Sequence, residues 1–170
     1  MFDNRNKSLI AETVFLHPGR KFYLRELAEE SGVSASTVSR LIDELEEEGI
    51  VEVKKDMKME IKARDDEKFR DLKKSYNLWR LSETGLLEKL EECFPEAIVL
   101  FGSYSRGEDR SGSDIDIALV NGREAGFDLE GYENELERVI NIHNVNLDET
   151  DENFIETLAN GIVLRGYLEI

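Results

Sequence analysis

The chain has 170 residues, a single cysteine and a net charge of −16. This length allows one domain or two small ones with a real hydrophobic core, and one cysteine excludes a disulfide framework or a cysteine-based zinc site. The sequence shows neither a signal peptide nor an apolar run of membrane length, which predicts a cytoplasmic protein without a membrane partner. The charge is uneven, because residues 81–170 hold 6 Lys and Arg against 21 Asp and Glu. This asymmetry indicates two modules.

The first 63 residues follow the pattern of three helices and a β-hairpin. Apolar residues recur at helical spacing in residues 7–16, 24–30 and 35–48. Residues 50–53 and 59–61 then alternate in the manner of two short strands. The hairpin between them is basic.

This order closely resembles a winged helix-turn-helix, and the segments Leu27–Ser34 (LAEESGVS) and Thr37–Arg40 (TVSR) carry the resemblance. A recognition helix enters the major groove with small polar residues at its N-terminal end, and a basic wing reaches phosphates. We therefore expect double-stranded DNA as a partner. The candidate DNA-binding residues are Ser34, Ser36, Thr37, Ser39 and Arg40 on the helix and Lys54, Lys55 and Lys58 on the hairpin.

Two features favour other interpretations of this module. The rest of the third helix is acidic (Asp43, Glu44, Glu46, Glu47 and Glu48), so only its first two turns can approach DNA. Winged helices also serve as protein-docking modules, and a basic hairpin can simply be solvated. With a single arginine on the recognition face, one copy should bind DNA weakly, so we expect a homodimer on a two-part site.

Residues 64–81 predict a charged amphipathic linker helix, with Phe69, Leu72, Tyr76 and Trp79 at helical spacing. We favour a connector packed on one domain over a dimerisation helix. Ser82 and Glu83 should begin a further helix that ends before Pro95. The predicted domains are therefore residues 1–63 and 82–170, joined by the linker.

The stretch Ala97–Val120 carries the chemistry of the second half. Five apolar residues predict a buried strand that stops at Gly102 and Ser103, and Asp114 and Asp116 then stand two apart in a second apolar run. A period of two places both carboxylates on one strand face, where they repel each other. Mg²⁺ relieves that repulsion, since it takes one or two carboxylates and leaves its other positions to water and phosphate. The glycine-serine turn offers backbone N–H groups to such a phosphate.

This stretch resembles the signature of the nucleotidyltransferase superfamily of DNA polymerase β. The matching residues are Gly102-Ser103, followed after ten residues by Asp114-Ile115-Asp116. Phe101–Gly107 (FGSYSRG) resembles its minimal single-domain branch. The resemblance covers roughly the second half and implies a small mixed sheet with helices packed on it, which makes the whole chain α+β. It also implies a nucleoside triphosphate, with ATP expected, and Mg²⁺, with two ions in an active enzyme.

By the same resemblance, Gly102 and Ser103 would hold phosphates, and Asp114 and Asp116 would be the catalytic metal ligands. Arg106 could contact a phosphate or lie on the surface. Tyr104 is interpreted as a packing residue, and His143 is assigned no role.

Active members of the family carry a third carboxylate on a neighbouring strand, in a Val-Asp-Leu-like run. After a predicted helix over residues 129–140, we match that run to Val145-Asn146-Leu147-Asp148 in a third strand. This places the neutral Asn146 at the third position. Asp148 lies two residues further on the same strand face and could substitute as a metal ligand if the register shifted.

Two functions from different classes remain open. In the first, the protein is a DNA-binding transcriptional regulator whose second domain binds a nucleotide, with or without turnover. In the second, it is an active nucleotidyltransferase that modifies a partner protein or RNA, targeted or autoregulated by its winged helix. The resemblance makes a helical toxin-like protein a plausible partner, because minimal family members are often paired with such proteins. We favour the regulator because of Asn146.

Overall fold

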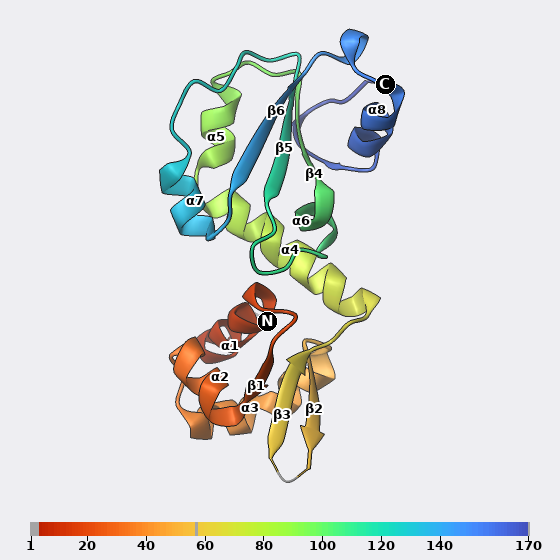
Figure 1. Ribbon diagram of the computed structural model, residues 1–170. Coiled ribbons are helices and arrows are strands. Elements are labelled where there is room, and N and C mark those ends of the chain that lie inside the picture. The colour runs from red at the N-terminus through yellow and green to blue at the C-terminus, as the bar shows by residue number, and fades with distance from the viewer. Residues whose placement is uncertain (1–3, 57, 170) are drawn as a thin grey trace. The chain divides into compact units, whose positions relative to one another are not determined.

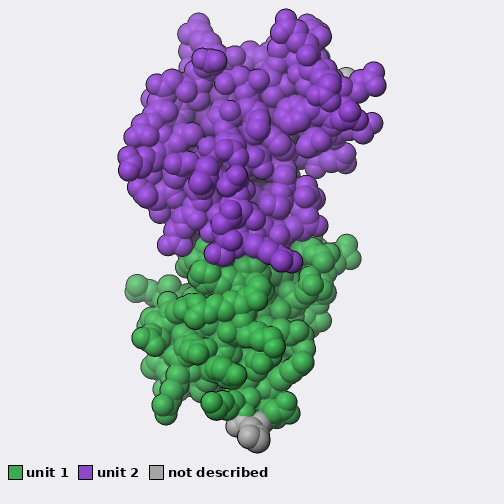
Figure 2. All heavy atoms as spheres, viewed as in Figure 1, with its two compact units in different colours: residues 1–73 green, residues 74–170 purple. Residues whose placement is uncertain are grey.

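A computed structural model of the chain describes residues 4–56 and 58–169. It divides into two compact units, residues 1–73 and 74–170 (Figure 2). The division falls inside one continuous helix, α4 (Glu67–Glu83). Each unit combines helices with a small sheet, which agrees with the predicted α+β class. The sequence predicts a separate linker over residues 64–81, and these domain boundaries remain a prediction. No helix within the described ranges is long and apolar enough to span a membrane.

The first unit places three helices against a three-stranded antiparallel sheet (Figure 1). The strand order is β1-β3-β2, so the N-terminal strand pairs with the second strand of the hairpin. The elements are α1 (Arg5–Leu16), β1 (Lys21–Tyr23), α2 (Leu24–Ser31), α3 (Ala35–Glu48), β2 (Val51–Lys55) and β3 (Met59–Ala63).

Local sequence explains the turn between α2 and α3. Gly32 ends α2 in the left-handed conformation, with φ 66°, which costs glycine little. Ser34 caps α3, because its hydroxyl accepts a hydrogen bond from the backbone N–H of Thr37. Gly32, Val33 and Ser34 thus connect α2 to α3. The apolar stripe of α3 is then buried, as its spacing predicts; it consists of Val38, Leu41, Ile42 and Leu45.

The second unit is built on a four-stranded mixed sheet with the order β6-β5-β4-β7 (Figure 1). Strands β5 and β6 are parallel, and the other pairs are antiparallel. After α4, the elements are α5 (Leu86–Glu91), β4 (Ala97–Phe101), α6 (Gly102–Arg106), β5 (Ile115–Val120), α7 (Glu130–Leu136), β6 (Ile140–Val145), a 3₁₀ helix (Leu147–Glu149), α8 (Glu152–Ala159) and β7 (Ile162–Gly166).

The two faces of this sheet pack against different helices. Ile115, Ile117 and Leu119 of β5 face a core that includes buried leucines of α4, α5 and α7. Ala118 and Val120 face the opposite core, which includes Leu158 of α8. Because side chains alternate along a strand, Asp116 points to the face that α8 covers.

Three predicted element borders are wrong. The helix predicted from Ser82 begins instead at Leu86, because α4 continues to Glu83 and Gly85 turns the chain with φ 74°. The helix predicted over residues 129–140 ends at Leu136, where Glu137 takes a left-handed conformation. Strand β6 therefore starts at Ile140, several residues earlier than predicted, and Leu147 lies in a 3₁₀ helix.

Candidate functional site

Gly102 and Asp116 meet where strand β4 ends. Phe101 lies opposite Asp116 in the antiparallel pair, and Gly102 follows with φ 75°. The backbone comes so close that a Cβ on Gly102 would lie 2.6 Å from Oδ2 of Asp116. Glycine is needed here both for the left-handed φ and for this approach. The structure thus brings the predicted glycine-serine turn to the predicted carboxylate.

The residue beside Asp116 on the next strand is Asn141. The parallel pairing of β5 with β6 sets Asn141 opposite Asp116. Its Nδ2 donates hydrogen bonds to Oδ2 of Asp114 and to Oδ1 of Asp116, each at 3.2 Å. One neutral amide thus bridges the two carboxylates and relieves their repulsion. A carboxylate at position 141 would face both aspartates.

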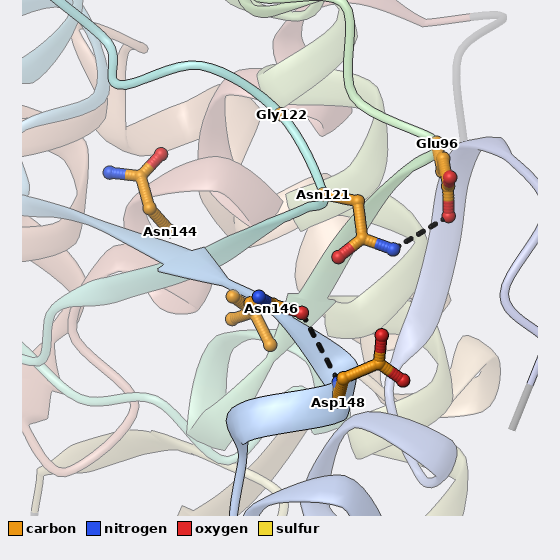
Figure 3. A pocket seen from close by; sticks show the side chains of 7 residues that line it. Glu96, Asn121, Gly122, Asn144, Asn146 and Asp148 are labelled. Atoms are coloured by element: carbon orange, nitrogen blue, oxygen red, sulfur yellow. Dashed lines mark hydrogen bonds between the residues drawn. The ribbon is translucent and has the colours of Figure 1, made fainter.

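Two predictions about the third ligand of the site are wrong. Asn146 does not occupy the position of the third carboxylate, and Asp148 does not replace it as a metal ligand. Val145 lies opposite Val120, so Asn146 lies past the far end of β5, five residues beyond the partner of Asp116 and about 17 Å along the strand. Figure 3 shows Asn146 and Asp148 at a different pocket, beside Asn121 and Glu96. There Oδ1 of Asn146 accepts a hydrogen bond from the backbone N–H of Asp148. Asp148 is therefore not placed to share a metal ion with Asp116. The neutral side chain that lies beside Asp116 on the neighbouring strand is that of Asn141.

His143 also belongs to this site, which the sequence did not reveal. It lies two residues after Asn141 on the same strand, and its ring packs against Phe101 and Phe154, with centroid distances of 5.2 and 6.0 Å. Its Nε2 lies 3.6 Å from Oδ1 of Asp116 and is shielded from solvent without a hydrogen-bond partner. A shielded polar atom without a partner indicates a place for a missing ligand, ion or water. The sequence signal for both residues is the alternation Ile140-Asn-Ile-His, whose first residue falls in the helix predicted over residues 129–140.

Asn77 of α4 anchors the loop that leads to Asp114. Its buried amide donates to the carbonyl oxygen of Tyr104 at 2.9 Å and to Oδ1 of Asp109 at 2.8 Å. The carboxylate of Asp109 also lies 3.8 Å from the guanidinium of Arg138. Burial raises the pKa of the Tyr104 hydroxyl, which is consistent with the predicted packing role. These contacts hold the loop that connects α6 to the two aspartates.

The remaining predicted nucleotide-binding residues lie next to Gly102 on the short helix α6. Ser103 is partly exposed, whereas Arg106 is exposed at the end of the helix. The Nε of Arg106 donates to Glu108 at 2.7 Å. The structure therefore places Arg106 on the same short helix as Gly102, with its guanidinium paired to Glu108.

The donor set fits one divalent cation better than two. Asp114 and Asp116 both face the amide of Asn141, and Mg²⁺ is commonly held by two carboxylates together with phosphate oxygens. For the metal to replace the amide hydrogens, Asn141 would need to turn its oxygen inward. Over the described ranges, no group of three or more His, Cys, Asp and Glu side chains is arranged to hold a metal ion. The two carboxylates together balance the charge of one divalent cation.

The predicted recognition helix presents its polar end to solvent. Ser36, Ser39 and Arg40 are exposed on α3, and Thr37 is partly exposed. The hydroxyl of Ser34 also lies 2.8 Å from Oγ1 of Thr37, so its main role is to cap the helix. Lys54, Lys55 and Lys58 are exposed on the wing.

The acidic half of α3 is used inside the first unit. Glu44 and Glu48 bind Nζ of Lys7 at 3.1 and 2.7 Å, and these contacts raise the pKa of Lys7. Asp43 holds Nζ of the wing residue Lys55 at 3.0 Å.

Glu46 completes this arrangement by accepting a hydrogen bond from the backbone N–H of Val53 in β2. Most of these carboxylates thus stabilise the fold and hold the wing. Their partners neutralise part of the charge that seemed to oppose DNA.

Two family models match the chain. One is described as winged helix-turn-helix DNA-binding and matches residues 24–52, which run from α2 into β2. The other is described as polymerase beta, nucleotidyltransferase, and matches residues 86–166, from the start of α5 to the end of β7. The protein is thus a DNA-binding winged helix joined to a nucleotidyltransferase-like domain. Both predicted resemblances are thereby confirmed: the first unit resembles the winged helix-turn-helix model and the second unit the polymerase β nucleotidyltransferase model over the matched residues. No curated protein matches the chain.

Proposed function

We propose that this protein is a DNA-binding transcriptional regulator whose second unit binds a Mg²⁺-nucleoside triphosphate as a ligand and turns it over slowly or not at all. The observation that carries the proposal is the position of Asn141. It lies beside Asp116, where active relatives are expected to have a third carboxylate, and hydrogen-bonds both aspartates.

Each residue of the site has a distinct part in this proposal. Asp114 and Asp116 hold the cation that accompanies the phosphates, and Gly102 and Ser103 receive the phosphates at the adjoining turn. Mg²⁺ would neutralise phosphate oxygens and polarise the phosphorus atom. Asn141 adds an amide but no charge, and an amide cannot take the proton of an attacking hydroxyl. The site thereby keeps the residues that bind the nucleotide, but it lacks the third carboxylate that nucleotidyl transfer requires.

The first unit supplies the DNA-binding half of the proposal. Ser36, Thr37, Ser39 and Arg40 lie at the N-terminal end of α3, the part that a recognition helix inserts into the major groove. Lys54, Lys55 and Lys58 reach phosphates from the wing. A homodimer would double these contacts on a two-part site, which offsets the small number of basic residues in one copy.

Calorimetry of ATP binding in the presence of Mg²⁺ tests the ligand role. We expect binding to the wild type, and loss of binding in EDTA or in the Asp114→Asn/Asp116→Asn variant. Asp148→Asn is the matched control, because it removes an exposed carboxylate at the other end of the sheet. ATP binding that is indifferent to EDTA or to the double variant would overturn the assignment.

The alternative function is an active nucleotidyltransferase that modifies a partner protein, such as a helical toxin-like protein, or RNA. The close approach of Gly102 to Asp116 favours it, because the geometry of the phosphate turn and first carboxylates is retained. Robust transfer of labelled AMP by the wild type would replace the regulator with this enzyme.

A further inference from the structure

A cavity adjoins Gly102 on the side of α8. It has a volume of about 280 Å³ and lies between α6 and α8. Phe101, Gly102, Ser105 and Arg106 line it on one side. Asn153, Glu156 and Thr157 of α8 line the other side, together with Asn160, which caps the end of that helix. Asn153, Glu156 and Asn160 recur every three or four residues, so they share one helix face. The opposite face of α8 buries Leu158 in the core of the sheet.

Two polar side chains in this cavity have no partner. Within the described part of the chain, the amide of Asn153 and the carboxylate of Glu156 make no hydrogen bond or ion pair. The nearby bonds on α8 use backbone oxygens instead: Thr157 donates to the carbonyl of Asn153, and Asn160 donates to the carbonyl of Glu156. Both side chains are exposed, so they are accessible to a ligand that enters the cavity.

The size and position of the cavity suit part of a nucleotide. Pockets that enclose a whole small molecule usually measure about 300–1,000 Å³, so this one holds a fragment. Gly102 lies in the cavity wall and also against Asp116. A nucleotide with its phosphates at the aspartates would thus have its neighbouring group at this cavity.

The hydrogen-bond acceptors on α8 suit the sugar of a nucleotide. Phe101 is the one aromatic side chain in this lining and is 7% exposed, so it offers almost no surface for stacking a base. Carboxylate and amide oxygens accept hydrogen bonds from hydroxyl groups, and acidic side chains hold ribose hydroxyls in other nucleotide-binding folds. Hydroxyl-rich ribose matches this lining.

We propose that the cavity between α6 and α8 binds the ribose of the nucleotide, with Glu156 accepting hydrogen bonds from the 2′- and 3′-hydroxyls and Asn153 supporting them. The second unit thereby distinguishes ribonucleotides from 2′-deoxyribonucleotides. This inference rests on the proposed function, and it assigns α8 a part in ligand selection.

The test compares ATP with 2′-deoxy-ATP by calorimetry on the full chain in excess Mg²⁺. Loss of one hydrogen bond to a charged group should weaken binding about tenfold, so the wild type should prefer ATP by about that factor. Glu156→Ala should bring the ratio near one, because it removes the acceptor while alanine suits a helix. Glu152→Ala is the matched control, since it makes the same change on the same helix outside the cavity.

Equal affinities of the wild type for the two nucleotides would overturn the inference and leave the proposed function intact. An ATP preference that survives in Glu156→Ala would overturn it as well. Failure of both nucleotides to bind the wild type would instead remove the proposed function, and the ribose site with it.

Discussion

Gly102 lies so close to Asp116 that a Cβ at position 102 would come 2.6 Å from the carboxylate oxygen. The contact links the turn that should receive phosphates to the strand that should hold a cation. It also explains the glycine of the glycine-serine pair by geometry alone.

Gly102→Ala should therefore abolish Mg²⁺-dependent ATP binding, because the methyl group displaces Asp116. Backbone strain should also cost about 1–2 kcal/mol of unfolding free energy, measured by urea titration. Gly112→Ala is the control for strain, since Gly112 has φ 87° with open space around its Cβ position. It should lose similar stability and keep ATP binding. If Gly102→Ala binds ATP as the wild type does, the contact is unimportant.

Asn141→Asp should convert the site toward catalysis. A third carboxylate beside Asp116 supplies the missing charge, and a well-placed base or ligand typically contributes ~10²–10⁴ in rate. Transfer of labelled AMP to the protein itself, a partner protein or RNA is the measurement. Thermal stability should fall in EDTA, where three carboxylates repel one another, and recover with Mg²⁺.

Asn146→Asp is the control for this substitution, because it places the same charge at the far end of the sheet. It should remain inactive. If neither variant transfers AMP, the second unit has only a binding role. If Asn146→Asp alone transfers AMP, the site described around Asn141 is refuted.

Duplex DNA binding should depend strongly on salt and on Arg40. Arg40→Ala should cost about 1–3 kcal/mol if the guanidinium reads a base, measured by fluorescence anisotropy. Lys54→Ala should lower the slope of log K against log salt by about one unit, because one phosphate contact is lost. Lys89→Ala, on α5 of the other unit, should change neither quantity. Absence of duplex binding at low salt would contradict the DNA-binding half of the proposal.

The contribution of Lys7 to stability should disappear in alkali. Its hydrogen bonds to Glu48 and Glu44 raise its pKa above the usual 10.5, so the folded state favours the charged ammonium. The stabilisation is complete below 10.5 and is lost as the pH rises through the raised pKa. The difference in unfolding free energy between wild type and Lys7→Met should thus shrink above that pH. Lys54→Met is the control, and a difference that stays constant with pH would contradict the pairing.

The sequence predicted the parts of the site that depend on local pattern. Gly102 directly follows β4, Asp114 directly precedes β5 and Asp116 lies in β5. The apolar runs and the period of two in these strands are visible in the sequence. Asn141 was missed because its place depends on the parallel pairing of β5 with β6, which joins segments about 25 residues apart. Glu137 ends the preceding helix in a left-handed conformation that a non-glycine residue rarely adopts, so the start of β6 was hidden.

The acidic half of α3 shows the same limit in the first unit. Composition indicated a surface that repels DNA, whereas Glu44, Glu46 and Glu48 have partners on α1 and β2. These partners come from elements that are distant in sequence, and helical periodicity carries no information about them. The charge pattern predicted exposure correctly for Asp43 but could not reveal its pairing with Lys55.

The helix α4 has a practical consequence for dissecting the protein. Its first part supplies Phe69, whose ring lies 5.5 Å from that of Phe15, and its later part supplies Asn77, which holds Tyr104 and Asp109. A gene fragment that stops before Glu67 would deprive the winged helix of a core residue, and one that starts after Glu83 would leave the loop before Asp114 unanchored. Each fragment should therefore retain its own share of this helix, and a protease that separates the halves must first unwind it.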